Sequence, residues 1–216
     1  MRYLLAIVAF MVVFGDTSFA QTEFTREYNN YRMGVGPLLG YKLGINTVDP
    51  TEGIKNDIGA ASMPDFGATF YMPLDPDQRM GLFLDLVYAN YAYSQKYYNS
   101  PKEWTDKFSY LDLGANFYIS GFTIGLNVGI PIGLNLEENP TALSYYHDKT
   151  AALNTLYEFR VGGNFTLNES NVGRFILFVN AGYQINGQYS DEVNMGSYNP
   201  HPASLQLGLS YLINVE

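Results

Sequence analysis

Residues 122–135 read Phe-Thr-Ile-Gly-Leu-Asn-Val-Gly-Ile-Pro-Ile-Gly-Leu-Asn, and the alternation in this stretch decides the fold. Every second residue from Phe122 to Leu134 is apolar, and the residues between them are Thr, Gly, Asn or Pro. Because successive side chains of a β-strand point to opposite faces, the stretch predicts a strand with one apolar face and one small, polar face.

The same alternation recurs along the rest of the chain. Glycine and polar residues separate the alternating segments, as is usual for strands joined by turns. Together with 122–135, the pattern predicts eight strands over residues 35–46, 65–72, 81–94, 108–119, 122–135, 156–167, 174–186 and 204–214.

The predicted connections alternate in length. Short turns are expected at 73–80, 120–121 and 168–173, and long loops at 47–64, 95–107, 136–154 and 187–203. In an up-and-down meander, this places every long loop at one end and both termini at the other. That layout is typical of bacterial outer-membrane barrels, so we predict an all-β, eight-stranded antiparallel up-and-down transmembrane β-barrel.

A soluble lipocalin-like barrel is the alternative, with the apolar face lining a ligand cavity and the polar face in water. A water-facing surface should carry many charges of both signs. The polar phases of 122–135 and 204–214 carry none, and their small residues suit the crowded interior of a narrow barrel. The apolar phase is therefore expected to face lipid.

Aromatic residues gather at the predicted strand ends, where membrane barrels carry girdles at the two interfaces. We expect one girdle to include Tyr88, Tyr91 and Tyr93 near the loop end, and the other Tyr71, Phe117, Phe122, Phe165 and Phe175 near the turn end.

The first twenty residues predict a signal peptide. Arg2 precedes an apolar stretch, and Ser18-Phe19-Ala20 provides the small residues that precede cleavage. We therefore divide the chain into a signal peptide (1–20), an N-terminal lead segment (21–34) and a barrel domain (35–216). Phe24, Tyr28 and Tyr31 have helical spacing, so the lead is either a short helix or a flexible segment.

Composition excludes several other classes. The net charge of −9 argues against a nucleic-acid partner, because phosphate contacts need Lys and Arg. The absence of Cys excludes disulfides and cysteine-ligated metals. The longest apolar run, residues 3–14, is shorter than the roughly 18 residues of a membrane-spanning helix.

Two motifs resemble a known family. The segment Gly40-Tyr-Lys-Leu-Gly-Ile-Asn46 is similar to the G-x-K-x-G-x-N first strand of the PorT-type outer-membrane β-barrels of Bacteroidota, and Leu207-Gly-Leu-Ser-Tyr-Leu212 is similar to their last strand. The family belongs to the broader OmpX/OmpA-like eight-stranded barrels. The resemblance implies an outer-membrane location and an accessory role in protein secretion. The terminal Ile213-Asn-Val-Glu216 departs from the aromatic ending of many such barrels.

Catalytic, cofactor and metal sites are not expected. A catalytic pair of Ser144 and His147 would lie in a predicted loop, as would His201, and loops position a nucleophile and a base poorly. Upstream of His147 lie Glu137 and Glu138. The carboxylate groups at Asp49, Glu52 and Asp57 and at Asp191 and Glu192 lack the spacing of a calcium loop.

The informative charges lie on the polar phase in mid-strand: Lys42, Asp85, Asp112, Glu158 and Arg160. Buried charges need partners, so we expect Lys42 and Arg160 to lie among the three acids. Such a set could form an ion path or a gate, or a salt-bridge network that fills the lumen. The second interpretation is favoured in so narrow a barrel.

The sequence thus predicts a non-enzymatic integral protein of the bacterial outer membrane that acts through extracellular loops or its rim. Adhesion, envelope integrity and membership of an outer-membrane or secretion complex are the candidate roles. The expected partners are outer-membrane lipid and, through the loops, other envelope proteins. The alternatives are a narrow channel for small solutes and a soluble lipocalin-like carrier of an apolar ligand.

Overall fold

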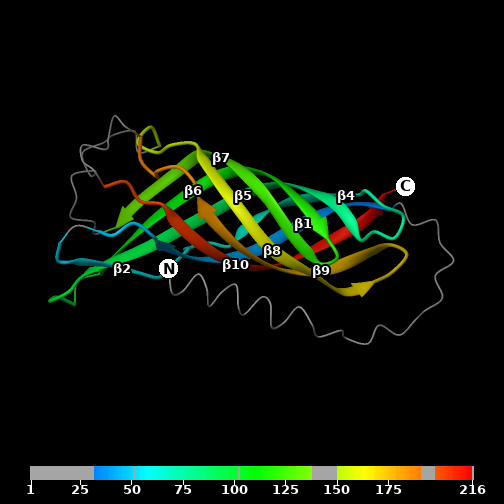
Figure 1. The fold of residues 1–216 in the computed structure, drawn as a ribbon, viewed down its shortest axis with the longest axis horizontal. Coiled ribbons are helices and arrows are strands. Elements are labelled where there is room, and N and C mark those ends of the chain that lie inside the picture. Colours follow the sequence, from blue (N-terminus) through cyan, green and yellow to red (C-terminus); the bar gives the residue numbers. More distant parts are fainter. Residues whose placement is uncertain (1–31, 51, 102, 138–149, 191–197, 216) are drawn as a thin grey trace.

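The computed structural model describes residues 32–50, 52–101, 103–137, 150–190 and 198–215. These residues form one antiparallel sheet that curls into a barrel (Figure 1). In the described part of the chain, no helix is long and apolar enough to cross a membrane. The strands are β1 (Met33–Asn46), β2 (Ile54–Asp57), β3 (Gly59–Ala60), β4 (Asp65–Pro73), β5 (Met80–Tyr97), β6 (Glu103–Ile119), β7 (Phe122–Glu137), β8 (Leu156–Glu169), β9 (Gly173–Gln184) and β10 (Pro202–Val215).

Pairing between the first and last strands closes the barrel. The order runs β10-β9-β8-β7-β6-β5-β4-β1, and β1 also pairs antiparallel with β10 from Met33↔Val215 to Asn46↔Pro202. Because β2 and β3 continue the position of β4 in the wall, the ten strands fill eight positions. The predicted eight-stranded up-and-down barrel is confirmed, although β1 begins at Met33, inside the segment assigned to the lead.

Parts of two predicted long loops form strands. Within 47–64, β2 pairs with β5 and β3 pairs with β1. Likewise β5 and β6 remain paired as far as Lys96↔Glu103, so most of 95–107 is a hairpin. The prediction failed there because these ends extend beyond the apolar band and carry polar side chains on the outward face. In these segments the outward-facing residues are polar, so the sequence shows no alternation between apolar and polar residues.

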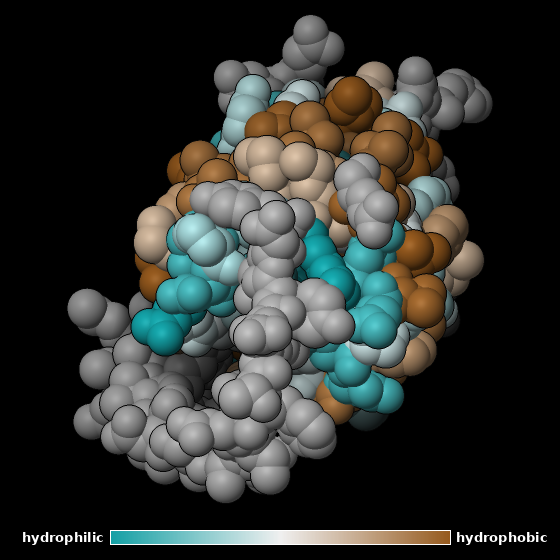
Figure 2. Space-filling model, turned by 90° about the vertical axis from the view of Figure 1, so that its right-hand side faces the viewer, coloured by the Kyte–Doolittle hydropathy of each residue, from teal (hydrophilic) through white to brown (hydrophobic). Residues whose placement is uncertain are grey.

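The two side-chain phases face as predicted. On β7, Leu126 is 55 % exposed, whereas its neighbour Asn127 is 1 % exposed. Viewed from the turn end, the described hydrophilic residues gather in the middle and the hydrophobic ones at the sides (Figure 2). Apolar side chains exposed on the outer wall come from every position around the barrel, and include Leu39, Phe66, Leu86, Leu113, Ile124, Phe159, Phe175, Leu207 and Leu209.

A bulge in β7 reverses the phase near the loop end. Ser109 pairs with Gly133 but Tyr110 pairs with Pro131, which leaves Ile132 without a partner on β6. Leu134, opposite the buried Phe108, consequently packs against the interior cluster and Asn135 is exposed. The prediction that Leu134 shares the lipid-facing phase is wrong, because one extra residue turns every later side chain to the other face.

The aromatic girdles contain fewer residues than predicted. Tyr71, Tyr91 and Tyr93 are buried inside the barrel and belong to neither girdle. Outward-facing pairs do occur: the Phe66 and Tyr88 rings stack with centroids 5.0 Å apart, and those of Phe175 and Tyr211 lie 4.5 Å apart. The exposed Phe122 and Phe165 lie at the turn end, as expected.

Candidate functional site: a filled lumen

Two ion pairs lie inside the lumen, one between the neighbouring strands β1 and β4 and one along β8. The Lys42 Nζ lies 3.2 Å from Asp65 Oδ2, and the two side chains are 1 % and 0 % exposed. Arg160 donates from Nη2 to Glu158 Oε1 at 2.8 Å, and from Nε to the same oxygen at 3.1 Å. Each buried cation thus has a carboxylate partner, as burial of a charge requires.

Tyr91 connects the first pair to a further carboxylate. Its hydroxyl donates to Asp112 Oδ2 at 2.9 Å, and Lys42 Nζ lies 3.4 Å from the centre of its ring. A cation above a ring face is attracted by the electrons of the ring, and more strongly so where water is excluded. Nearer the turn end of the lumen, Asn116 Nδ2 donates to Asp85 Oδ2 at 2.9 Å.

The five predicted lumen residues are all buried in the barrel, but their pairing differs in part. Arg160 pairs within the set, with Glu158. The partner of Lys42 is Asp65, which the sequence reasoning missed. Asp65 directly follows Pro64 at the start of β4, so its sequence context resembles a loop carboxylate. Its oxygens also accept hydrogen bonds from the backbone N–H of Asn90 (2.6 Å) and from Gln206 Nε2 (2.5 Å).

Inward-facing glycines make room for these polar groups. A Cβ added at Gly129 would lie 2.2 Å from Asp112 Oδ1, and one at Gly182 would lie 2.6 Å from Glu158 Oε2. Both distances are far below contact, so the carboxylates lie flat against a wall that only glycine leaves open. This crowding explains why the polar phase of the sequence is so rich in glycine.

Toward the loop end, aromatic side chains fill the lumen. The cluster includes Tyr91, Tyr93, Phe108, Tyr110 and Phe178. Two residues from the connections join it, Leu153 and Tyr189, and these two form an isolated bridge with each other. Gln188 Nε2 donates to the Tyr110 hydroxyl at 2.5 Å.

The turn end is closed by a second cluster. Tyr71, Phe83, Ile176 and Leu212 are buried there, with Tyr118 packed against them. The Arg174 guanidinium lies 4.3 Å from the centre of the Tyr71 ring and donates to Gln78 Oε1 at 3.0 Å. The ion pairs therefore lie between two packed clusters, an arrangement that holds the wall strands together.

Several of the residues considered for catalysis or metal binding lie outside the part of the chain that the structure describes, namely Ser144, His147, Glu138, Asp191 and Glu192. His201 Nδ1 lies 3.3 Å from the Gln184 carbonyl oxygen, and its ring is stacked near that of Tyr183. The side chain of Asp57 pairs with Lys96, whose hydrogen bond lowers the pKa of this carboxyl group. No cluster of three or more potential metal ligands occurs in the described part of the chain.

The fold and its surface define an integral outer-membrane β-barrel. An apolar outer wall around a polar, filled interior is suited to hydrocarbon, and a closed sheet leaves no wall strand with an unpaired edge in the lipid. No family model and no curated protein matches the sequence.

Solved structures with a similar fold include small barrels. Neisserial surface protein A has 9 % identity and a TM-score of 0.41, over 82 % of this chain and 95 % of that one. The outer membrane protein OprG from Pseudomonas aeruginosa has 14 % identity and a TM-score of 0.36, over 87 % and 97 %. The outer membrane protein AlkL, solved in lipid bilayers, has 14 % identity and a TM-score of 0.41, over 92 % and 98 %.

Proposed function

We propose that the protein is a non-enzymatic, non-conducting outer-membrane barrel that acts through its loop end or its rim. The observation that carries the proposal is the lumen, in which Lys42–Asp65 and Arg160–Glu158 lie between two packed clusters. A lumen filled in this way serves the stability of the wall and leaves the exposed ends to meet partners. Adhesion, envelope integrity and membership of an outer-membrane complex all fit this arrangement. The resemblance to PorT-type barrels favours an accessory role in secretion.

The two alternatives have less support. A narrow channel needs a continuous aqueous path, but Tyr71 and Leu212 at one end and Tyr110 at the other are at most 1 % exposed. A lipocalin-like carrier needs an apolar cavity, but the apolar phase of the strands faces outward and the mid-lumen side chains are polar.

Conductance measurements test the proposal. Mature protein inserted into planar bilayers is expected to give no stepwise current in potassium chloride at moderate voltage, with a conducting porin as the positive control. Replacing Tyr71 and Phe83 together by Ala removes most of the aromatic volume at the turn end but leaves the Lys42 and Arg160 pairs in place. This variant is also expected to remain closed. Steps of uniform size in the unmodified protein would instead favour the channel.

Single cysteines report which end is extracellular, because the natural chain contains none. Asn99 lies in the β5–β6 connection and Asp77 in the β4–β5 turn, and both are exposed. On intact cells, we expect an impermeant maleimide to label Asn99→Cys strongly and Asp77→Cys only after permeabilisation. The opposite pattern would place the loop end in the periplasm and contradict a function at the cell surface.

A further inference from the structure

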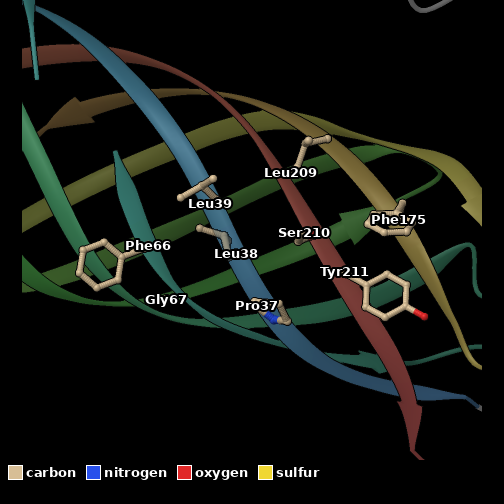
Figure 3. Close-up of a pocket in the computed structure, with 9 residues that line it drawn as sticks. All are labelled: Pro37, Leu38, Leu39, Phe66, Gly67, Phe175, Leu209, Ser210 and Tyr211. Atoms are coloured by element: carbon tan, nitrogen blue, oxygen red, sulfur yellow. The ribbon is translucent and has the colours of Figure 1, made fainter. Parts of the chain in front are cut away.

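A hollow lies on the described part of the outer wall, away from the lumen and the loops. It lies across β4, β1, β10 and β9 and has a volume of about 470 Å³ (Figure 3). Leu39, Phe66, Leu209 and Phe175 form its sides, and its floor includes Pro37 and Gly67. We call this hollow the seam groove, because it lies over the β1–β10 seam that closes the barrel.

The seam groove lies where the β1–β10 ladder is interrupted. Pairing is present at Val35↔Ile213 and again at Leu38↔Ser210, but Gly36 and Pro37 have no paired partner on β10. Proline has no backbone N–H to donate to a ladder. Ser210 and Leu38, whose side chains are on the lumen phase, are also among the residues that line the groove.

We propose that the seam groove binds one acyl chain of a bilayer lipid. The groove is continuous with the lipid-facing wall, because the Leu39 and Leu209 side chains on either side of the seam are 54 % and 48 % exposed. An apolar hollow offers water too few hydrogen-bond partners to hold it there.

Tyr211 sets the direction of the bound chain. It lies at the turn-end side of the groove, with its ring packed on Phe175. Its hydroxyl makes no hydrogen bond to the described residues. Tyrosine at a membrane interface places its ring in the apolar layer and its hydroxyl near the headgroups. The lipid headgroup is therefore expected at the turn end, with the chain running along the seam toward Leu39 and Leu209.

A photoreactive lipid tests this inference on the complete mature protein. The probe is a phosphatidylethanolamine with a diazirine in its palmitoyl chain, present at low mole fraction in phosphatidylcholine vesicles. After irradiation, peptide mapping is expected to find roughly tenfold more adducts on 37–39 and 209–211 than on Leu126 and Phe159, a preference of about 1.4 kcal/mol. The exposed fractions of these two controls, 55 % and 40 %, bracket those of Leu39 and Leu209. An even distribution around the barrel would mean ordinary boundary lipid and would overturn the proposal.

Two substitutions on one strand provide the matched comparison. Leu209→Trp narrows the groove, whereas Leu207→Trp, on the same outward face of β10, lies outside its lining. The first is expected to lower the adduct yield at 37–39 about tenfold and the second to leave it unchanged. Equal yields in the two variants would contradict the proposal, as would a protein–protein crosslink lost only in Leu209→Trp, because the occupant would then be a second copy of the chain. If Leu209→Trp does not fold, the adduct map of the unmodified protein still decides.

Discussion

Replacing Lys42 by Met is expected to lower the free energy of unfolding by about 3–5 kcal/mol. The substitution leaves the side-chain volume nearly unchanged but removes the cation from Asp65, which is fully buried. An unpaired carboxylate in that position loses its main compensation, while its hydrogen bonds from Asn90 and Gln206 remain. The measurement is reversible urea unfolding of the mature protein in lipid vesicles.

A double variant and a matched surface variant complete the experiment. Adding Asp65→Asn to Lys42→Met removes the unpaired carboxylate, so the double variant should recover a large part of the lost free energy of unfolding. Lys96→Met breaks a pair of the same kind, but Lys96 and Asp57 are each 33 % exposed. Water screens such pairs, so this change should matter little. Equal losses for Lys42→Met and Lys96→Met would show that the lumen behaves like bulk water.

The alternation of apolar and polar residues predicted well which side chains face outward. The face on which a side chain lies depends only on its position along its own strand. The phases of Leu126 and Asn127 follow from a period of two and need no knowledge of partners. The interior location of Lys42 and Arg160 follows from the same rule. Tyr91 and Tyr93 lie on the same phase of β5 as Asp85, so alternation also places them inside, and only their aromatic type suggested an interfacial girdle. The structure turns those rings inward, where they fill the lumen above the ion pairs.

The ion pair of Lys42 depends on the register between β1 and β4, which alternation along a single strand does not predict. On β1, Gly40 pairs with Asp65 of β4, and this alignment brings the carboxylate to Lys42 two residues along the strand. The bulge at Ile132 is similarly invisible, since Pro131 and Gly133 continue the alternation of the residues before them. The interior location of the five mid-strand charges was therefore predictable, but Asp65 at the start of β4 and the pairing of the charges were not.

Leu126→Arg is expected to cost about 2–4 kcal/mol, because it places a charge against hydrocarbon near the middle of the apolar band. The neighbouring Asn127→Ser faces the lumen and should cost less, about 1.5 kcal/mol, since it removes the hydrogen bond from Asn127 Nδ2 to the Glu158 carboxylate (3.1 Å) but adds no charge. The two positions are adjacent, so they share strand propensity and assembly history, and only their facing differs. Urea titrations of both variants in the same vesicles give the comparison.

Fluorescence quenching by brominated acyl chains separates lipid contact from simple burial in an apolar core. The natural chain has a single tryptophan, Trp104, which is 4 % exposed and on the interior phase of β6. Its emission should be nearly insensitive to bromine on the lipid chains. In a Trp104→Phe background, Leu126→Trp should be strongly quenched, because its ring would stand among those chains. Weak quenching of Leu126→Trp, together with equal stability of Leu126→Arg and Asn127→Ser, would mean that the outer wall does not face lipid and that the barrel works in water.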